Sequence, residues 1–175
     1  MKQNEQFRQF IREHASDDPM RLLLSASKYP DVDVPFAVEQ LLARRQIKDK
    51  LPTWYQNDAL VFPAKITAEQ SSSEQTALYK QRLINAEDAL CDLTGGLGID
   101  SYYFSRKAKS VTYIERFPAY CEAAVANFEV LGADNITVLQ GDSTELAGQI
   151  EGIDLFYIDP ARRGDGNRRV FALQD

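Results

Sequence analysis

Cysteine, histidine and long apolar runs are scarce in this sequence of 175 residues. It has two cysteines and one histidine. Cys91 lies in an expected strand and Cys121 on an expected helix, so the sequence predicts neither a disulfide nor a metal site. His14 lies on the apolar stripe of an expected helix at 4–15, where a structural role is more usual than a catalytic one. No apolar run is long enough for a signal peptide or a membrane span, and we therefore expect a reduced, cytoplasmic protein.

Positively charged residues are fewer than negatively charged ones. Twenty lysines and arginines face 26 acidic residues, which gives a net charge of −6 and argues against non-specific binding of nucleic acid by the whole surface. Two local clusters of cations are still expected to contact RNA: Arg44, Arg45, Lys48 and Lys50 beside two aromatic residues, and Arg162, Arg163, Arg168 and Arg169 in a glycine-rich loop. The alternatives are cations that complement the dipole at a helix C-terminus for the first cluster, and a solvated loop for the second.

Three glycines lie together directly after a short apolar run. Residues 89–92 read as a strand, and Gly95, Gly96 and Gly98 form a turn before an expected helix at about 99–105, a geometry that brings the backbone close to a nucleotide cofactor. The third glycine of the dinucleotide fingerprint is missing, and no Gly-Lys-Ser/Thr follows, so the pattern is neither that fingerprint nor a P-loop. The carboxylate of Asp92 suits a ligand with an ammonium or sulfonium group, such as S-adenosylmethionine.

Each of the four expected strands ends in a carboxylate. The strands are expected at 89–92, 110–115, 136–140 and 153–158, and the acids are Asp92, Glu115, Asp142 and Asp159. Helical patterns lie between the strands, which predicts an α/β fold with a doubly wound parallel sheet. The carboxyl ends of parallel strands meet at one edge of such a sheet, so the four acids are expected to converge on one crevice.

The N-terminal third of the sequence reads as helical. Asp18-Pro19 and Asp33-Val34-Pro35 are typical helix starts, and we expect residues 22–24 to be buried and residues 60–63 to form a short extended linker. Capping-box spacing at Ser71-Ser72-Ser73-Glu74 predicts a further helix at about 72–84. The expected organisation is a small all-helical domain at 1–66, followed by an α/β domain at 67–175 that stops after its fourth strand.

The segments 92–98, Glu115, Asp142 and 159–162 resemble the successive motifs of class I S-adenosylmethionine-dependent methyltransferases, over about residues 70–165. The common form of the first motif has glycine where this chain has Thr94. The resemblance implies a Rossmann-like sheet, S-adenosylmethionine as the cofactor, and ribose and adenine contacts from Glu115 and Asp142. The expected cofactor contacts are Ser72, Ser73, Glu74, Asp92, Thr94, Gly95, Gly96, Gly98, Glu115, Arg116, Phe117, Asp142, Ser143 and Asp159. The first three could equally be simple helix caps.

The motif Asp159-Pro160-Ala161-Arg162-Arg163-Gly164 is similar to one in the uracil-C5 RNA methyltransferases. It resembles less closely the Asp-Pro-Pro-Trp of trimethylguanosine-synthase-like enzymes, which methylate an exocyclic amine. The chain is also similar to bacterial proteins that join such a domain to a THUMP-like RNA-binding module. The resemblance implies methyl transfer to a base in RNA, with Asp159, Pro160 and Arg162 in catalytic positions.

Two alternatives stay open at this point. A ring-carbon target would require a cysteine nucleophile, which neither Cys91 nor Cys121 is placed to supply, whereas an amine target requires none. A non-catalytic nucleotide- or RNA-binding module that keeps the fold is the alternative to an enzyme. Because no fifth strand follows residue 158, we expect a fragment that self-associates through the exposed strand at 153–158 and has little activity of its own.

Overall fold

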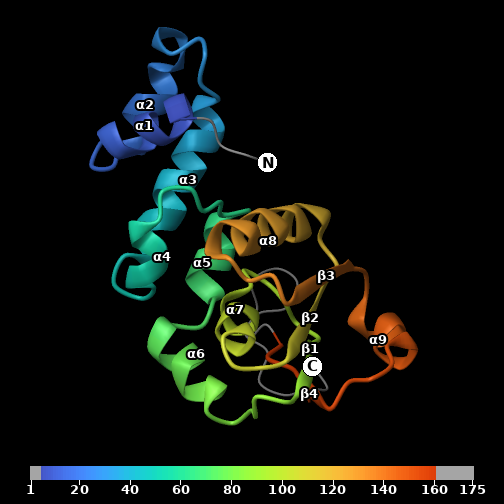
Figure 1. Ribbon diagram of the computed structural model, residues 1–175. Helices are drawn as coiled ribbons and strands as arrows, with labels where there is room; N and C mark the ends of the chain where they lie inside the picture. The colour runs from blue at the N-terminus through green and yellow to red at the C-terminus, as the bar shows by residue number, and fades with distance from the viewer. Residues whose placement is uncertain (1–4, 161–175) are drawn as a thin grey trace.

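The structure, a computed structural model, describes residues 5–160, which form a helical N-terminal part and a sheet flanked by helices (Figure 1). The sheet contains β1 (Ala89–Asp92), β2 (Ser110–Glu115), β3 (Ile136–Gln140) and β4 (Leu155–Tyr157) in the order β3-β2-β1-β4. All three pairings are parallel. The predicted α/β class and parallel sheet are confirmed, and the order places a switch point between β1 and β4.

The first three strands have the bounds expected from the sequence, but β4 is shorter than 153–158. Asp154 lies just before β4, and its backbone N–H donates to the carbonyl of Ala89 while its carboxylate accepts from the Ala89 N–H. These two bonds align the start of β4 with β1 before the strand ladder begins.

The connections between strands place helices against the sheet. The helix α7 (Ile99–Ser105) joins β1 to β2, and α8 (Pro118–Leu131) joins β2 to β3; right-handed crossovers in the same direction put both on one face. The link from β3 back to β4 holds α9 (Ser143–Leu146) and the short turn η2 (Ala147–Gln149). Before the sheet, α6 (Glu74–Gln81) packs on α7.

The N-terminal part consists of α1 (Glu5–Glu13), α2 (Pro19–Leu24), η1 (Ala26–Lys28), α3 (Val34–Ile47), α4 (Pro52–Gln56) and α5 (Lys65–Gln70). Asp18 and Asp33 cap α2 and α3, as predicted, by accepting bonds from backbone N–H groups three residues on. The expected burial of residues 22–24 is wrong for two of the three. A helix of six residues turns one narrow face to its neighbours, so Leu22 is buried while Leu23 is exposed and Leu24 is 81% exposed.

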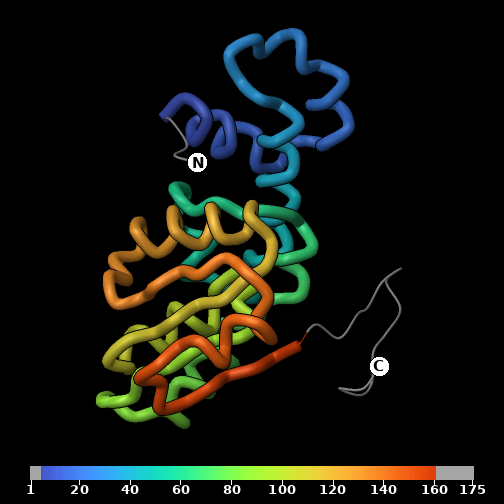
Figure 2. The backbone as a smooth tube through the Cα atoms, turned by 90° about the vertical axis from the view of Figure 1, so that its right-hand side faces the viewer, coloured from blue at the N-terminus to red at the C-terminus, as the bar shows by residue number. Residues whose placement is uncertain are grey.

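The expected linker at 60–63 is instead part of the core. Leu60, Val61 and Phe62 are buried, and side-chain amides satisfy their backbone: Gln40 of α3 bonds both polar groups of Phe62, and Asn127 of α8 bonds both those of Val61. In Figure 2, α3 runs down from the N-terminal helices into the part that holds the sheet. One hydrophobic cluster contains residues from both sides of residue 66, and the division of the chain there stays a prediction.

The expected RNA-binding cluster at the end of α3 is a set of structural contacts. Arg44 is only 7% exposed and donates to the carbonyls of Tyr55, Asn57 and Leu60. Arg45 donates to two carbonyls after α1, and Lys50 to two at the end of α5. Arg44, Arg45 and Lys50 therefore bond backbone carbonyl groups of neighbouring segments, while Arg45 and Lys48 are exposed to solvent. Within residues 5–160, no helix has the length and apolar character that crossing a membrane requires.

Candidate functional site

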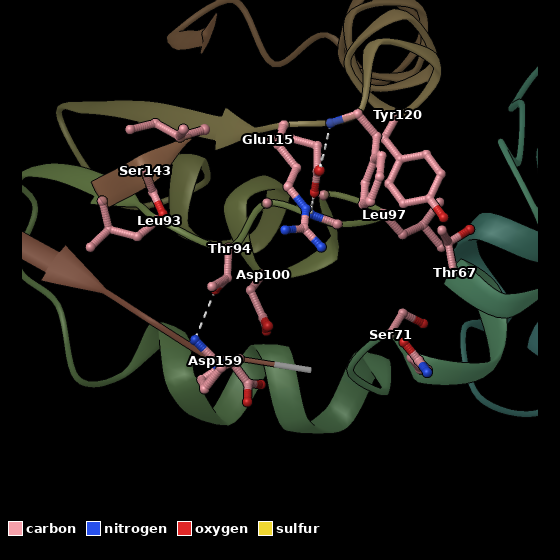
Figure 3. A pocket seen from close by; sticks show the side chains of 18 of the residues that line it. Thr67, Ser71, Leu93, Thr94, Leu97, Asp100, Glu115, Tyr120, Ser143 and Asp159 are labelled. Carbon is pink, nitrogen blue, oxygen red and sulfur yellow. Dashed lines mark hydrogen bonds between the residues drawn. The ribbon is translucent and has the colours of Figure 1, made fainter. Parts of the chain in front are cut away.

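A pocket of about 590 Å³ lies at the carboxyl ends of the strands (Figure 3). Its lining comes from the glycine turn after β1, the residues that follow β2, β3 and β4, and the connection between α5 and α6. The predicted site residues among its lining are Ser72, Thr94, Gly95, Gly96, Gly98, Glu115, Arg116, Phe117, Asp142, Ser143, Asp159 and Pro160. This is the convergence expected for the carboxyl ends of parallel strands, and the pocket lies at the switch point of the sheet.

Glu115 ends β2 and faces the glycine turn. One carboxylate oxygen accepts the Gly96 N–H at 3.0 Å, and the other accepts the Phe117 N–H at 2.9 Å. Each oxygen keeps a lone pair toward the pocket, so the group is held in place by the backbone and can accept two further hydroxyl donors. This is the arrangement that a vicinal diol requires.

An aromatic wall and a second carboxylate lie beside Glu115. Phe117 and Tyr120 both line the pocket with ring centres 5.2 Å apart, and the Arg116 guanidinium lies 4.8 Å from the centre of the Phe117 ring. Asp142 caps α9 by accepting two hydrogen bonds from Thr144, and these bonds lower the pKa of Asp142. A flat ring with an amino group fits between such an aromatic edge and a charged carboxylate.

The glycines of the turn are required by the core behind them. A Cβ at Gly95 would lie 2.3 Å from the ring of Tyr113, a fully buried residue whose hydroxyl donates to the Gly96 carbonyl. Gly98 has a φ of +84° and begins α7, where a side chain would also meet the ring of Phe128. The turn thus lies directly on two aromatic rings, which places its other side at the pocket.

Asp92 does not lie where the sequence suggested. It is 1% exposed and is absent from the pocket lining, because its carboxylate points behind the turn to accept from the Thr94 N–H and the Ser101 hydroxyl. Burial raises the pKa of Asp92 to about 6, although these hydrogen bonds oppose the rise. Asp92 therefore shapes the turn and does not reach a ligand directly.

Of the three cofactor contacts expected at the start of α6, one lines the pocket and two do not. Ser72 lines the pocket, whereas Ser73 caps α6 by accepting the Thr76 N–H, and Glu74 accepts two bonds from Thr53. Ser73 therefore caps α6 and Glu74 links α6 to Thr53, so the side-chain oxygens of both residues are already used within the fold. The helix expected at about 72–84 is present but shorter, Glu74–Gln81, with Ser73 as its N-cap and no capping box, and the cofactor contact is left to Ser72.

Three residues that surround Asp159 were missed by the sequence reasoning. Lys80 of α6 donates to Asp100 of α7 at 3.0 Å, to Asp159 at 3.0 Å and to the hydroxyl of Tyr157 at 2.5 Å. The Tyr157 hydroxyl lies 3.0 Å from the Asp100 carboxylate. Asp100 was visible as an acid two residues after the last glycine, but no local signal relates Lys80 to a residue 79 positions later.

Asp159 lies at the mouth of the pocket, with its side chain 47% exposed. Its backbone N–H donates to the Thr94 hydroxyl at 2.8 Å, the bond drawn in Figure 3, so the residue after β4 is tied to the glycine turn. Pro160 follows it in the lining. The predicted RNA contacts Arg162, Arg163, Arg168 and Arg169 lie outside the described residues.

Neither cysteine takes part in the pocket. Cys91 and Cys121 are free and buried, and burial raises the pKa of both thiols, that of Cys91 to about 11. Among residues 5–160, no group of three or more His, Cys, Asp or Glu side chains is placed to hold a metal ion.

The residues present fit an adenosyl cofactor with a cationic tail. Glu115 and Asp142 offer acceptors for a ribose and an amine at one end, and Asp100 lines the pocket farther along. One oxygen of Asp100 accepts three hydrogen bonds, while the other, Oδ1, is buried with no partner among the described residues. A buried carboxylate oxygen without a donor is unfavourable, and a ligand ammonium group would satisfy it.

Comparison with known proteins agrees with this geometry. No family model matches the chain. A solved structure described as a methyltransferase of Porphyromonas gingivalis W83 superimposes with a TM-score of 0.76 and 32% identity, over 93% of this chain and 43% of that one. The 23S rRNA (uracil(1939)-C(5))-methyltransferase RlmD of Photobacterium angustum is 36% identical over 85 residues, 46% of this chain and 39% of the relative.

A third relative, the protein-L-isoaspartate O-methyltransferase of Methanoregula boonei, is 33% identical over 98 residues, 54% of this chain and 45% of its own length. The chain therefore spans less than half the length of each of these relatives. All three are described as methyltransferases, which does not favour the alternative of a non-catalytic module. In sequence and in fold, the chain is similar to class I S-adenosylmethionine-dependent methyltransferases.

Proposed function

We propose that this chain binds S-adenosylmethionine in the pocket at the strand ends and transfers its methyl group to a base in RNA. The observation that carries the proposal is one continuous pocket that extends from Glu115 and Asp142 to Asp100 and Asp159. The rRNA methyltransferase among the relatives and the motif at 159–160 support RNA as the substrate class.

The residues of the pocket divide between the parts of the cofactor. Glu115 accepts the two ribose hydroxyls, because its oxygens are already oriented by two backbone donors. Phe117 lies along the adenine, and Asp142 accepts from its amino group. Asp100 takes the ammonium group of the methionine moiety through its unpartnered oxygen. When bound, the cofactor supplies an electrophilic methyl group on a positively charged sulfur.

Asp159 orients the methyl acceptor, which is the base in RNA. It is half exposed at the mouth of the pocket, and its hydrogen bonds with described residues go to a single oxygen, Oδ2. Oδ1 is therefore available to accept an N–H of the incoming base and to orient it, a contribution of positioning rather than of covalent chemistry. Pro160 borders the same opening, and Arg162 is proposed to contact the RNA backbone.

The test begins with thermal unfolding in the presence of S-adenosylhomocysteine. A ligand at 100 times its dissociation constant adds about 2.7 kcal/mol, which raises the melting temperature of a domain of this size by roughly 5–10 °C. We expect that shift for the natural chain, and its loss in Glu115→Ala. Glu122→Ala is the matched control, because it removes an exposed carboxylate on α8 outside the pocket. Equal shifts in both variants would contradict the ribose role of Glu115.

The substrate is tested by transfer of tritiated methyl groups to total RNA. We expect low incorporation above the background without protein, which Asp159→Ala abolishes, and a chain that binds the cofactor without methylating any RNA would contradict the proposed acceptor. A 5-fluoropyrimidine RNA separates the two chemistries. A covalent adduct with the protein indicates a ring-carbon target and a thiolate, and its absence with active protein indicates nitrogen, in keeping with the buried cysteines.

A further inference from the structure

Lys80 is held between two carboxylates of the pocket, although it belongs to none of the sequence motifs. Its side chain is 19% exposed, and its ammonium group lies 3.0 Å from Oδ2 of Asp100 and 3.0 Å from Oδ2 of Asp159. It also donates to Ser72 at 2.9 Å and lies 5.1 Å from the centre of the Tyr157 ring. These contacts use all the donors of the ammonium group, so Lys80 has no capacity left for a direct bond to a ligand.

The cluster carries a single net negative charge at neutral pH. Burial lowers the pKa of Lys80, but its hydrogen bonds to Asp159 and Asp100 outweigh burial and raise that pKa overall, so the ammonium stays charged. Burial, and then the negative charges of Asp100 and Asp159, raise the pKa of Tyr157, so the phenol stays neutral. Two carboxylates and one ammonium sum to −1.

This charge lies at the end of the pocket away from Glu115. Figure 3 shows Glu115 and Tyr120 on one side of the glycine turn, with Asp100 and then Asp159 on the other side. An adenosyl ligand whose ribose is bound by Glu115 extends its other end toward Asp100 and Asp159. The sulfur at that end has one positive charge in the methyl donor and none in the thioether product, whereas the ammonium group proposed to meet Asp100 is present in both.

We propose that Lys80 is a specificity-determining and positioning residue: it holds Asp159 through Oδ2 and sets the net charge at the methyl-transfer end, and thereby the preference for the charged cofactor over the neutral product. The inference rests on the proposed function. Without the ammonium group, Asp100 and Asp159 would face the ligand as two negative charges. The pocket would then favour a positively charged ligand more strongly over a neutral one.

The test is the dissociation constant of S-adenosylhomocysteine divided by that of sinefungin, with both constants measured by isothermal titration at pH 7.5. The ligands are S-adenosylhomocysteine, which is neutral at the sulfur position, and sinefungin, which has an ammonium group near the position of the transferred methyl. In Lys80→Met we expect the preference for sinefungin to rise by about tenfold or more, since a unit charge several ångströms away acts through an effective dielectric constant of about 20. In Lys80→Arg, which keeps the charge, the ratio should stay within about threefold of the natural value.

A double variant makes the charge argument specific. Lys80→Met combined with Asp159→Asn restores a net charge of −1, so the ratio should return toward that of the natural chain. Asp159→Asn alone, a change at a half-exposed position, should lower the ratio and keeps the inference testable if Lys80→Met does not fold. Lys107→Met is the control for loss of a lysine, because Lys107 is exposed and outside the pocket.

The outcomes separate the inference from the proposed function. Equal weakening of both ligands in Lys80→Met would make Lys80 a purely structural residue and would overturn the inference alone. A natural chain that binds neither ligand would overturn the proposed function, and the inference with it.

Discussion

Asp92 should make the stability of this protein depend on pH in the direction opposite to that of a typical carboxylate. It is fully buried behind the glycine turn, and its carboxyl group accepts from the Ser101 hydroxyl at 2.6 Å and the Thr94 N–H at 3.0 Å. Burial raises the pKa of Asp92 to about 6 from an ordinary value of 3.8, because the two hydrogen bonds do not compensate for lost hydration. The folded state therefore binds a proton that the unfolded chain releases at lower pH.

The sign and size follow from that difference in pKa. Below about pH 4 the group is protonated in both states, and the stabilisation is fully present. Between about pH 4 and 6 the unfolded chain loses its proton first, so the free energy of unfolding falls as the pH rises, and the loss is complete above about pH 6. A rise of about two pKa units corresponds to about 3 kcal/mol.

Asp92→Asn isolates this contribution from every other titrating group. Its amide oxygen can still accept the Thr94 N–H and its amide nitrogen can donate to the Ser101 hydroxyl, but the side chain does not ionise. Urea unfolding of both proteins at several pH values gives their difference in stability. We expect the natural chain to lose about 2.5 kcal/mol relative to the variant between pH 4 and 7.5. Parallel stability curves over that range would refute the reasoning.

Two further predictions concern the core and the edge of the sheet. Asn127→Leu leaves the buried N–H and C=O of Val61 without partners, and should cost about 2–5 kcal/mol in denaturant unfolding, whereas Glu122→Ala on the same helix should cost less than about 0.5 kcal/mol. Self-association through residues 153–158 stays a prediction: Leu155 and Phe156 of β4 are exposed at the edge of the described sheet. Phe156→Lys should reduce the concentration dependence of the sedimentation coefficient, and a strict monomer of the natural chain would contradict the prediction.

The bounds of the first three strands could be predicted because each is a short apolar run that ends at a polar residue or a glycine. Burial of one strand face and the turn after it fix such a run locally. The same logic failed at residues 60–62. A short apolar run before Pro63 resembles a linker, and only the amides of Gln40 and Asn127, distant in sequence, allow its backbone to be buried.

Charge patterns were the least reliable part of the sequence reading. Arg44 and Lys50 are residue types typical of a nucleic-acid surface, but they donate to backbone carbonyl groups of segments that the sequence does not relate to them. The acids at the strand ends were identified correctly as a set, and three of the four line the pocket. Asp92 was the exception, because the chain turns immediately after β1 and directs that carboxylate under the turn.

Thr94 gives the departure from the common glycine motif a physical reason. Its backbone N–H donates to Asp92, and its hydroxyl accepts the N–H of Asp159, so one residue joins the buried acid, the glycine turn and the acid at the pocket mouth. The strand β4 ends at Tyr157, and two residues later the Asp159 N–H has the Thr94 hydroxyl as its partner. A glycine at position 94 would leave that amide to solvent. The hydroxyl instead fixes Asp159 relative to the glycine turn. The turn therefore sets the position of the residue that is proposed to orient the methyl acceptor.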